Sequence, residues 1–187
     1  MKIVNKQIAK STNQQVIFLL LLWLLFMGCK SEIKFPLETR LEFVSLEKID
    51  NGKEIDEKAL LILHFTDGDG NVGLDPTDNH PPFDSLYYYN FFVMYYAKRN
   101  GEFRAFPELN FFNARLPRFL PANNPESIKG DIKYIITIQN PNLVMLIDSV
   151  WVPVPEIDTI MFECWLIDRD LNESNHVFTP AITVKNR

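Results

Sequence analysis

Short apolar segments with a two-residue period, separated by turn residues, constrain the fold of this chain more than any other feature. Alternation with period two predicts a half-buried strand, and a segment dense in aromatic residues favours a strand over a helix. About seven such segments follow residue 36: 37–46, 59–65, 86–98, 102–106, 132–138, 158–167 and 177–184. No part of the chain after residue 36 has a convincing helical period.

Turn residues between these segments predict how the strands connect. Asn100-Gly101 separates two strand segments, and this pair is a strong hairpin signal because both central residues of a type I′ turn need positive φ. Pro180 marks the last strand as an edge or a bulge. Residues 107–127 contain four prolines and are predicted to form a long surface loop. The sequence predicts an all-β, immunoglobulin-like β-sandwich over residues 37–187, with a barrel as the alternative.

The amino-terminal segment has the layout of a secretory signal peptide. Lys2, Lys6 and Lys10 precede twelve consecutive apolar residues at 16–27, and Gly28-Cys29 follows. Twelve residues are too few for a stable membrane span, which needs about 20, and they suit the core of a signal helix. We expect a signal peptide over 1–28, a tether over 29–36 and the folded domain over 37–187.

The cysteine at the cleavage point carries the clearest functional signal. Gly28-Cys29 resembles the lipobox of bacterial lipoproteins. That resemblance implies diacylglycerol on the Cys29 thiol, cleavage before it and acylation of the new amino terminus. It places the protein in the cell envelope, anchored to the outer membrane on its periplasmic or its surface side. An ordinary signal peptide, or an uncleaved anchor, is the alternative.

Charge and cysteine content narrow the partners. The chain has a formal charge of −5, and loss of residues 1–28 removes three lysines and no acid, which leaves −8. A protein that binds nucleic acid needs clustered lysine and arginine, so nucleic acid is not an expected partner. Cys164 has no possible intramolecular partner if Cys29 carries lipid, and its strand-like surroundings predict an inert core thiol.

Two acidic loops are candidates for a metal site. Asp67, Asp69 and Asn71 alternate in the first loop, and Asp168, Asp170 and Asn172 alternate in the second. Calcium takes six to eight hard oxygen ligands, which such loops supply. In an immunoglobulin-like order the strands before these loops end at the same end of the sandwich, so the six residues are a predicted calcium site. Solvated turns without metal are the alternative.

Three segments together resemble small, uncharacterised lipoproteins common in Bacteroidetes. They are Asp67–Gly73, the hairpin Tyr95–Gly101 and Asp168–Asn175. The resemblance covers most of residues 37–187. It implies a location and a sandwich fold and does not imply an activity.

The sequence therefore predicts a lipid-anchored envelope protein that is not an enzyme and acts as a binding or accessory module, with calcium as a possible stabilising ion. Its expected partners are the membrane, through the lipid, and an envelope protein or glycan. Exposed aromatic residues of 87–96 or the loop 107–127 would touch that partner. The alternative is an envelope hydrolase that acts on glycan or peptide with carboxylates from the acidic loops.

Overall fold

The regular secondary structure of the described part of the chain is almost entirely β-strand. The computed structural model describes residues 35–119, 126–139 and 144–186, so the predicted signal helix at 1–28 and Cys29 lie outside it. No α-helix occurs within these ranges. The elements are β1 Arg40–Ile49, β2 Lys58–Asp67, β3 Phe91–Arg99, β4 Glu102–Ala105, the 3₁₀ helix η1 Asn110–Phe112, β5 Ile128–Thr137, β6 Val144–Ile147, β7 Val150–Pro153, β8 Ile157–Leu166, β9 Val177–Phe178 and β10 Ile182–Lys185.

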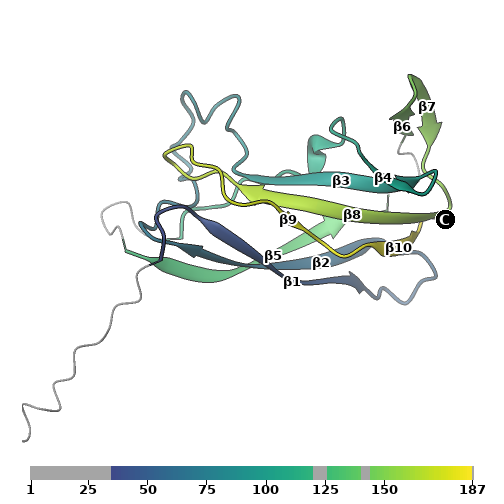
Figure 1. Ribbon diagram of the computed structural model, residues 1–187, viewed down its shortest axis with the longest axis horizontal. Helices are drawn as coiled ribbons and strands as arrows, with labels where there is room; N and C mark the ends of the chain where they lie inside the picture. Colours follow the sequence, from purple (N-terminus) through teal and green to yellow (C-terminus); the bar gives the residue numbers. More distant parts are fainter. Residues whose placement is uncertain (1–34, 120–125, 140–143, 187) are drawn as a thin grey trace, which may run out of the picture. The chain divides into compact units, whose positions relative to one another are not determined.

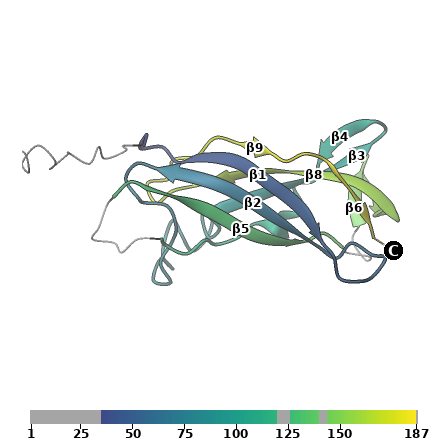
Figure 2. The same ribbon diagram turned by 90° about the horizontal axis from the view of Figure 1, so that it is seen from below.

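Two antiparallel sheets face each other, which confirms the predicted all-β sandwich. One sheet has the order β1-β2-β5, and the other has the order β10-β8-β3-β4 with β9 also paired to β8. Figure 1 shows the two layers, and Figure 2 shows β1, β2 and β5 side by side. Strands β2 and β3 follow each other along the chain but lie in opposite sheets. Such a crossing between sheets is a feature of immunoglobulin-like sandwiches.

The core lies between the sheets because the central strands alternate as the sequence predicts. Every second residue of β2 and β8 is buried, and the same holds for the first seven residues of β3. Phe91, Phe162 and Leu61 are among the largest fully buried side chains. Cys164 is buried in this core as a free thiol, as predicted, and burial raises its pKa to about 12.

The structure confirms the predictions made for the Asn100-Gly101 turn and for Pro180. Arg99 pairs with Glu102, so Asn100 and Gly101 form a two-residue turn, and both have positive φ, at 53° and 89°. Pro180 interrupts the last strand, which is divided into β9 and β10. Proline removes a backbone donor, so the ladder along β8 cannot continue through it.

Strand β1 begins three residues later than the predicted segment 37–46, and β5 begins four residues earlier than the predicted segment 132–138. Three further differences concern other parts of the chain. Strand β3 begins at Phe91 and not at residue 86, because residues 86–88 lie in a turn and a bend. The Asn90 side chain accepts a hydrogen bond from the Leu116 N–H just before the strand. The loop after β4 contains η1, and its Leu109 and Phe112 belong to the core. Residues 144–153 form a hairpin, β6–β7, in a part of the chain for which the sequence predicts no strand.

The strand directions define two ends of the sandwich. Strands β2 and β8 finish at one end, which we name the loop end and which comprises residues 67–90 and 168–175. The β6–β7 hairpin connects the far end of β5 to the start of β8, so it lies at the opposite end, at the upper right in Figure 1. The ten residues of β2 separate the two ends by about 30 Å.

Candidate functional site

The loop end brings the two predicted calcium loops together, but their first residues point inward. Asp67 is fully buried and accepts hydrogen bonds from the Thr39 hydroxyl at 3.2 Å and the Val72 N–H at 3.4 Å. Burial, with the nearby charge of Asp69, raises the pKa of Asp67. Asp168 is also buried, and it accepts from the backbone N–H and the side-chain amide of Asn172 at 2.8 and 2.9 Å. The carboxylates of Asp67 and Asp168 therefore stabilise the structure of the loop end through these hydrogen bonds.

Three of the six predicted residues meet across the loops. The Asn71 amide nitrogen donates to Asp69 Oδ2 at 3.2 Å and to Asp170 Oδ2 at 2.9 Å. The amide oxygen of Asn71 is buried and has no hydrogen-bond partner among the described residues. Within these residues no three His, Cys, Asp or Glu side chains gather closely enough to hold a metal ion. Calcium would need Asp69, Asp170 and the Asn71 oxygen together with backbone carbonyls, and it stays a prediction.

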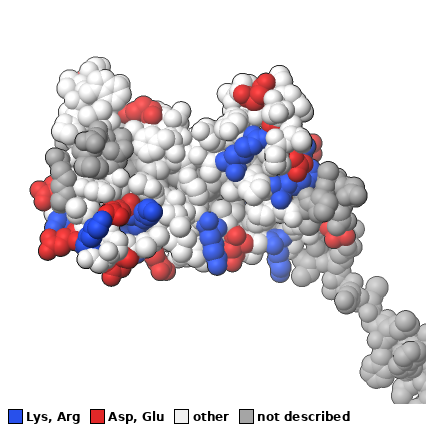
Figure 3. All heavy atoms as spheres, turned by 180° about the vertical axis from the view of Figure 1, so that it is seen from behind, with Lys and Arg blue, Asp and Glu red and all other residues white. Residues whose placement is uncertain are grey.

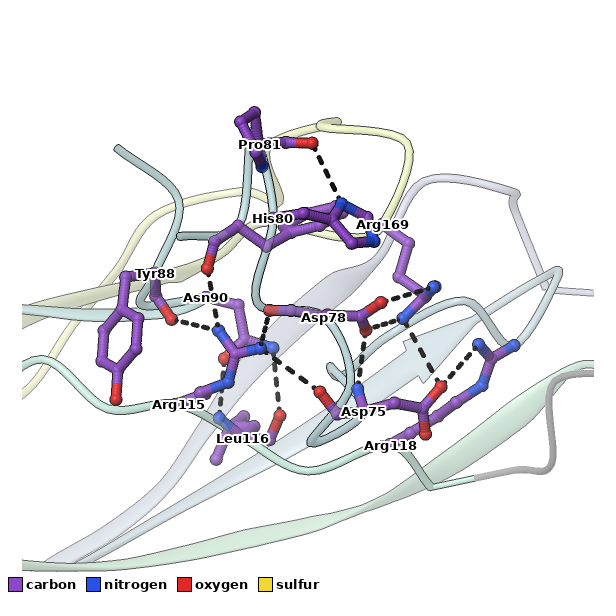
Figure 4. Close-up of polar contacts among 11 residues, drawn as sticks. Asp75, Asp78, His80, Pro81, Tyr88, Asn90, Arg115, Leu116, Arg118 and Arg169 are labelled. Carbon is purple, nitrogen blue, oxygen red and sulfur yellow. Dashed lines mark hydrogen bonds and ion pairs between the residues drawn. The ribbon is translucent and has the colours of Figure 1, made fainter. Parts of the chain in front are cut away.

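A half-buried guanidinium, that of Arg115, fixes the long loop that precedes β3. Arg115 donates to the backbone carbonyls of Asp78 and Tyr88 at 2.6 and 2.7 Å, with longer contacts to those of Asp75 and Phe83. Its guanidinium also lies 5.2 Å from the centre of the Tyr88 ring. Figure 4 shows Arg115 at the middle of these contacts. One side chain therefore holds a segment of about 14 residues, 75–88, in a single shape.

Arg169 ties the same segment to the loop after β8. Its guanidinium forms an ion pair with the buried carboxylate of Asp78 and lies 3.7 Å from Asp75 Oδ2 (Figure 4). Burial alone would raise the pKa of Asp78, but the hydrogen bond from Arg169, the N–H of Asp75 and the charge of Arg115 outweigh it and lower that pKa. The loop end is therefore cross-linked by charge as well as by hydrogen bonds.

The outer face of the β10-β8-β3-β4 sheet carries half-buried aromatic residues, among them Phe92 and Tyr96 of the aromatic segment. Trp165 stacks on Phe92 and on His176, with ring centres 5.2 and 4.7 Å apart and planes within 8° and 5° of parallel. Glu163 accepts from the Tyr96 hydroxyl at 2.6 Å and contacts His176 Nδ1 at 2.7 Å. Both faces of the Trp165 indole are covered, so this ladder offers no free indole face on which a sugar ring could stack.

The β6–β7 hairpin has an apolar outer face. In a two-stranded ribbon, directly opposed residues share a face, and side chains alternate along each strand. Leu146 pairs with Trp151 and Val144 pairs with Pro153, so these four lie on one face, and all four are exposed. On the other face Met145 is fully buried against the sandwich. The hairpin forms a projection at the upper left in Figure 3, largely free of charged atoms.

Contacts with the sandwich hold this hairpin in place. Arg99 Nη2 lies 3.0 Å from the Met145 sulfur, and the Leu146 N–H donates to Glu108 Oε1 at 3.2 Å. The turn residues Asp148 and Ser149 both have positive φ, at 50° and 67°. Asp-Ser is a weaker turn signal than Asn-Gly, so the turn alone does not predict the hairpin. The signal that could have found it is the pair of continuous apolar runs, Val144–Ile147 and Val150–Pro153, on the two sides of Asp148-Ser149.

Two cavities among the described residues are lined by side chains that do not suggest a catalytic site. One, of about 290 Å³, is lined by Phe111, Phe112, Tyr134, Ile135, Thr137 and Gln139 and has no carboxylate. The other, of about 240 Å³, includes Asp50 and Asp56. Asp50 accepts from the Gly52 N–H, and Asp56 pairs with Lys48 at 3.0 Å, so both already have structural partners.

Comparison with known proteins gives no relative from which a function could be inferred. Among the described residues no helix is long and apolar enough to cross a bilayer. The chain matches no protein-family model, no curated protein sequence and no solved structure.

Proposed function

We propose that this protein is a lipid-anchored binding module of the cell envelope that is not an enzyme and holds a protein partner through the outer face of the β6–β7 hairpin. The anchor is the lipid expected on Cys29, by the resemblance of Gly28-Cys29 to a lipobox. The lipoprotein resemblance of the two acidic loops and the Asn100-Gly101 hairpin supports the same location. Acylation with several chains would hold the protein durably on a membrane.

The single observation that carries the binding role is the exposed face of Val144, Leu146, Trp151 and Pro153. A ribbon with one buried face normally presents polar residues on the other. Here both faces are apolar, and Trp151 is 58% exposed. Exposed apolar patches mark interaction sites, and tryptophan is enriched among the residues that dominate binding energy. A protein surface suits this flat, uncharged face better than a glycan, which needs hydrogen-bonding side chains around it.

The hydrolase alternative has less support. A glycosidase needs two carboxylates about 5–10 Å apart beside a substrate cleft. The carboxylates of the loop end brace loops or pair with arginine, and those of the smaller cavity have structural partners. No pair is left facing a described cavity without another role.

Site-specific photo-crosslinking tests the proposal. Trp151 is replaced by benzoylphenylalanine in the full chain, and the cells that make it are irradiated. Phe178, an exposed aromatic residue of β9, is replaced in the matched control. We expect one discrete adduct from position 151 that is absent from position 178 and disappears when Leu146→Asp is added. No adduct at 151, or equal adducts at both positions, would contradict the binding role. Mass spectrometry of the mature amino terminus tests the lipid on Cys29 separately.

A further inference from the structure

The chain leaves the sandwich at the loop end. Residues 35–39 run beside the loop after β2, since the Phe35 and Pro36 carbonyl oxygens lie 2.6 and 2.4 Å from where a β-carbon on Gly68 would stand. Thr39 continues this contact through its hydroxyl bond to Asp67. Only a glycine fits at position 68 with the tether there. The chain that leads back toward Cys29 therefore leaves the sandwich at the loop end and not at the hairpin end.

The loop end also exposes large apolar side chains on several segments. Leu37 precedes β1, Leu86, Tyr88 and Tyr89 lie on the loop before β3, and Leu171 lies on the loop after β8. Leu86 and Leu37 are the most exposed, at 76% and 69%. All lie on segments that the register of the strands places at one end, because Arg40 pairs with Thr66 and Phe91 pairs with Leu166.

Hydrogen bonds and an ion pair hold the loops that carry these side chains in a fixed arrangement. Arg115 holds the loop that carries Leu86 and Tyr88, and the ion pair of Arg169 with Asp78 joins that loop to the one that carries Leu171. Tyr88 and Tyr89 pack edge to face, with ring centres 5.1 Å apart. Leucine in such an arrangement loses little conformational entropy on binding, and tyrosine favours the boundary between lipid and water.

The anchor and this surface are close along the chain. Five residues lie between Cys29 and Phe35, and the six steps from one Cα to the next span about 20 Å when the chain is fully extended. A lipid on Cys29 would therefore keep the loop end within about 20 Å of the bilayer. The short tether raises the effective concentration of lipid at the exposed apolar residues.

We propose that the loop end is a membrane-contacting surface, in which Leu37, Leu86, Tyr88, Tyr89 and Leu171 enter the headgroup region of the bilayer that carries the lipid of Cys29. This inference rests on the lipid anchor of the proposed function. Contact at the loop end points the β6–β7 hairpin away from the membrane. Asp69, Asp84 and Asp170 lie on the same loops, so anionic lipid does not drive the contact, and it forms on zwitterionic bilayers.

Fluorescence quenching in vesicles tests this surface. The full acylated chain carries Leu86→Cys, labelled with an environment-sensitive dye, in phosphatidylcholine vesicles that contain nitroxide lipids. The buried Cys164 thiol does not compete for label. Val150→Cys at the hairpin, also strongly exposed, is the matched control, and Leu171→Cys is a second reporter on the loop end. We expect at least twofold quenching of the labels at 86 and 171, none at 150, and no increase when phosphatidylglycerol is added.

The outcomes separate the inference from the anchor. An acylated chain whose labels at 86 and 171 stay unquenched overturns the membrane contact and leaves the anchor standing, and so does equal quenching at position 150. Quenching that requires anionic lipid overturns the apolar mode of contact. A chain without lipid on Cys29, by mass spectrometry, overturns the anchor and the inference with it.

Discussion

The Arg99 guanidinium forms a bidentate ion pair with Asp158, with nitrogen–oxygen distances of 2.6 and 2.7 Å.. The Asp158 side chain is 2% exposed and also accepts from the Thr159 N–H at 2.8 Å. Arg99 ends β3, Asp158 stands at the start of β8, and Arg99 reaches Met145 beneath the hairpin. The ion pair therefore links β3 to β8 and holds the arginine that contacts the base of the proposed binding surface.

Loss of one partner of this pair should be costly. Asp158→Asn leaves the buried guanidinium without a counter-charge, which is expected to lower the free energy of unfolding by about 3–5 kcal/mol. Urea unfolding, followed by circular dichroism, measures it. Glu54→Gln breaks the exposed Glu54–Lys185 pair and is the control, with little change in midpoint expected. Equal midpoint shifts for the two variants would contradict the role given to the Arg99–Asp158 pair.

Two glycines with positive φ allow the energetic cost of backbone strain to be measured apart from the cost of steric crowding. Gly52 has φ of 70° and open space around it, so Gly52→Ala should cost about 1 kcal/mol. Gly73 has φ of 96°, and a β-carbon there would lie 2.3 Å from the Pro117 carbonyl oxygen. Gly73→Ala should add roughly 1–3 kcal/mol of overpacking to the same backbone cost. Thermal unfolding of both variants checks the difference, and a Gly73→Ala variant no less stable than Gly52→Ala would contradict it.

Calcium at the loop end remains a specific prediction. If Asp69, Asn71 and Asp170 bind calcium, an ion concentration of 100 times Kd should stabilise the fold by about 2.7 kcal/mol. Isothermal titration and thermal unfolding with millimolar calcium measure this, and Asp170→Asn should weaken the effect. Asp131→Asn, an exposed acid on β5, is the control and should not. Neither heat nor a change in melting temperature in the unsubstituted protein would end the prediction.

His176 should make stability depend on pH near neutrality. Burial disfavours its charged form, but hydrogen bonds with Glu173 and Glu163 outweigh burial and raise the pKa of His176 above 6.5. The charged ring therefore contributes stability that is fully present below pH 6.5 and is lost as pH rises through the folded-state pKa. Tyr96, which also faces Glu163, has a pKa raised to about 12 and stays neutral throughout.

The measurement is urea unfolding between pH 5.5 and 9, for the natural sequence and for His176→Gln. We expect the advantage of the natural sequence to shrink as pH rises. A difference between the two proteins that stays constant across this range would show that the ring contributes only by stacking on Trp165.

Sequence periodicity predicted the sandwich because its central strands bury one face each. Strands β2, β3 and β8 are ten, nine and ten residues long, which gives alternation enough length to be recognised. The Asn100-Gly101 turn was predictable because positive φ at both positions excludes most residue pairs. The four-residue strands β6 and β7 are too short for periodicity to separate them from loop.

The loop end was predictable only in part. The predicted immunoglobulin-like strand order placed the loop of Asp67, Asp69 and Asn71 at the same end as that of Asp168, Asp170 and Asn172, and the Asn71–Asp170 hydrogen bond joins the two loops. Arg115 has no motif around it, because its acceptors are backbone carbonyls that any residue supplies. Its role depends on tertiary contacts about 30 to 40 residues away in sequence, which no local pattern encodes.

Strand β5 forms one of the two edges of its sheet, and its outward-facing side chains begin with Lys129, Asp131 and Lys133. An open edge can pair with the edge of another molecule, and charged side chains, lysine above all, discourage that pairing. Proteins tethered to one bilayer collide far more often than proteins free in solution. If Cys29 carries the proposed lipid, these charges would keep neighbouring molecules on the bilayer from pairing their sheet edges, and each molecule would stay a separate unit.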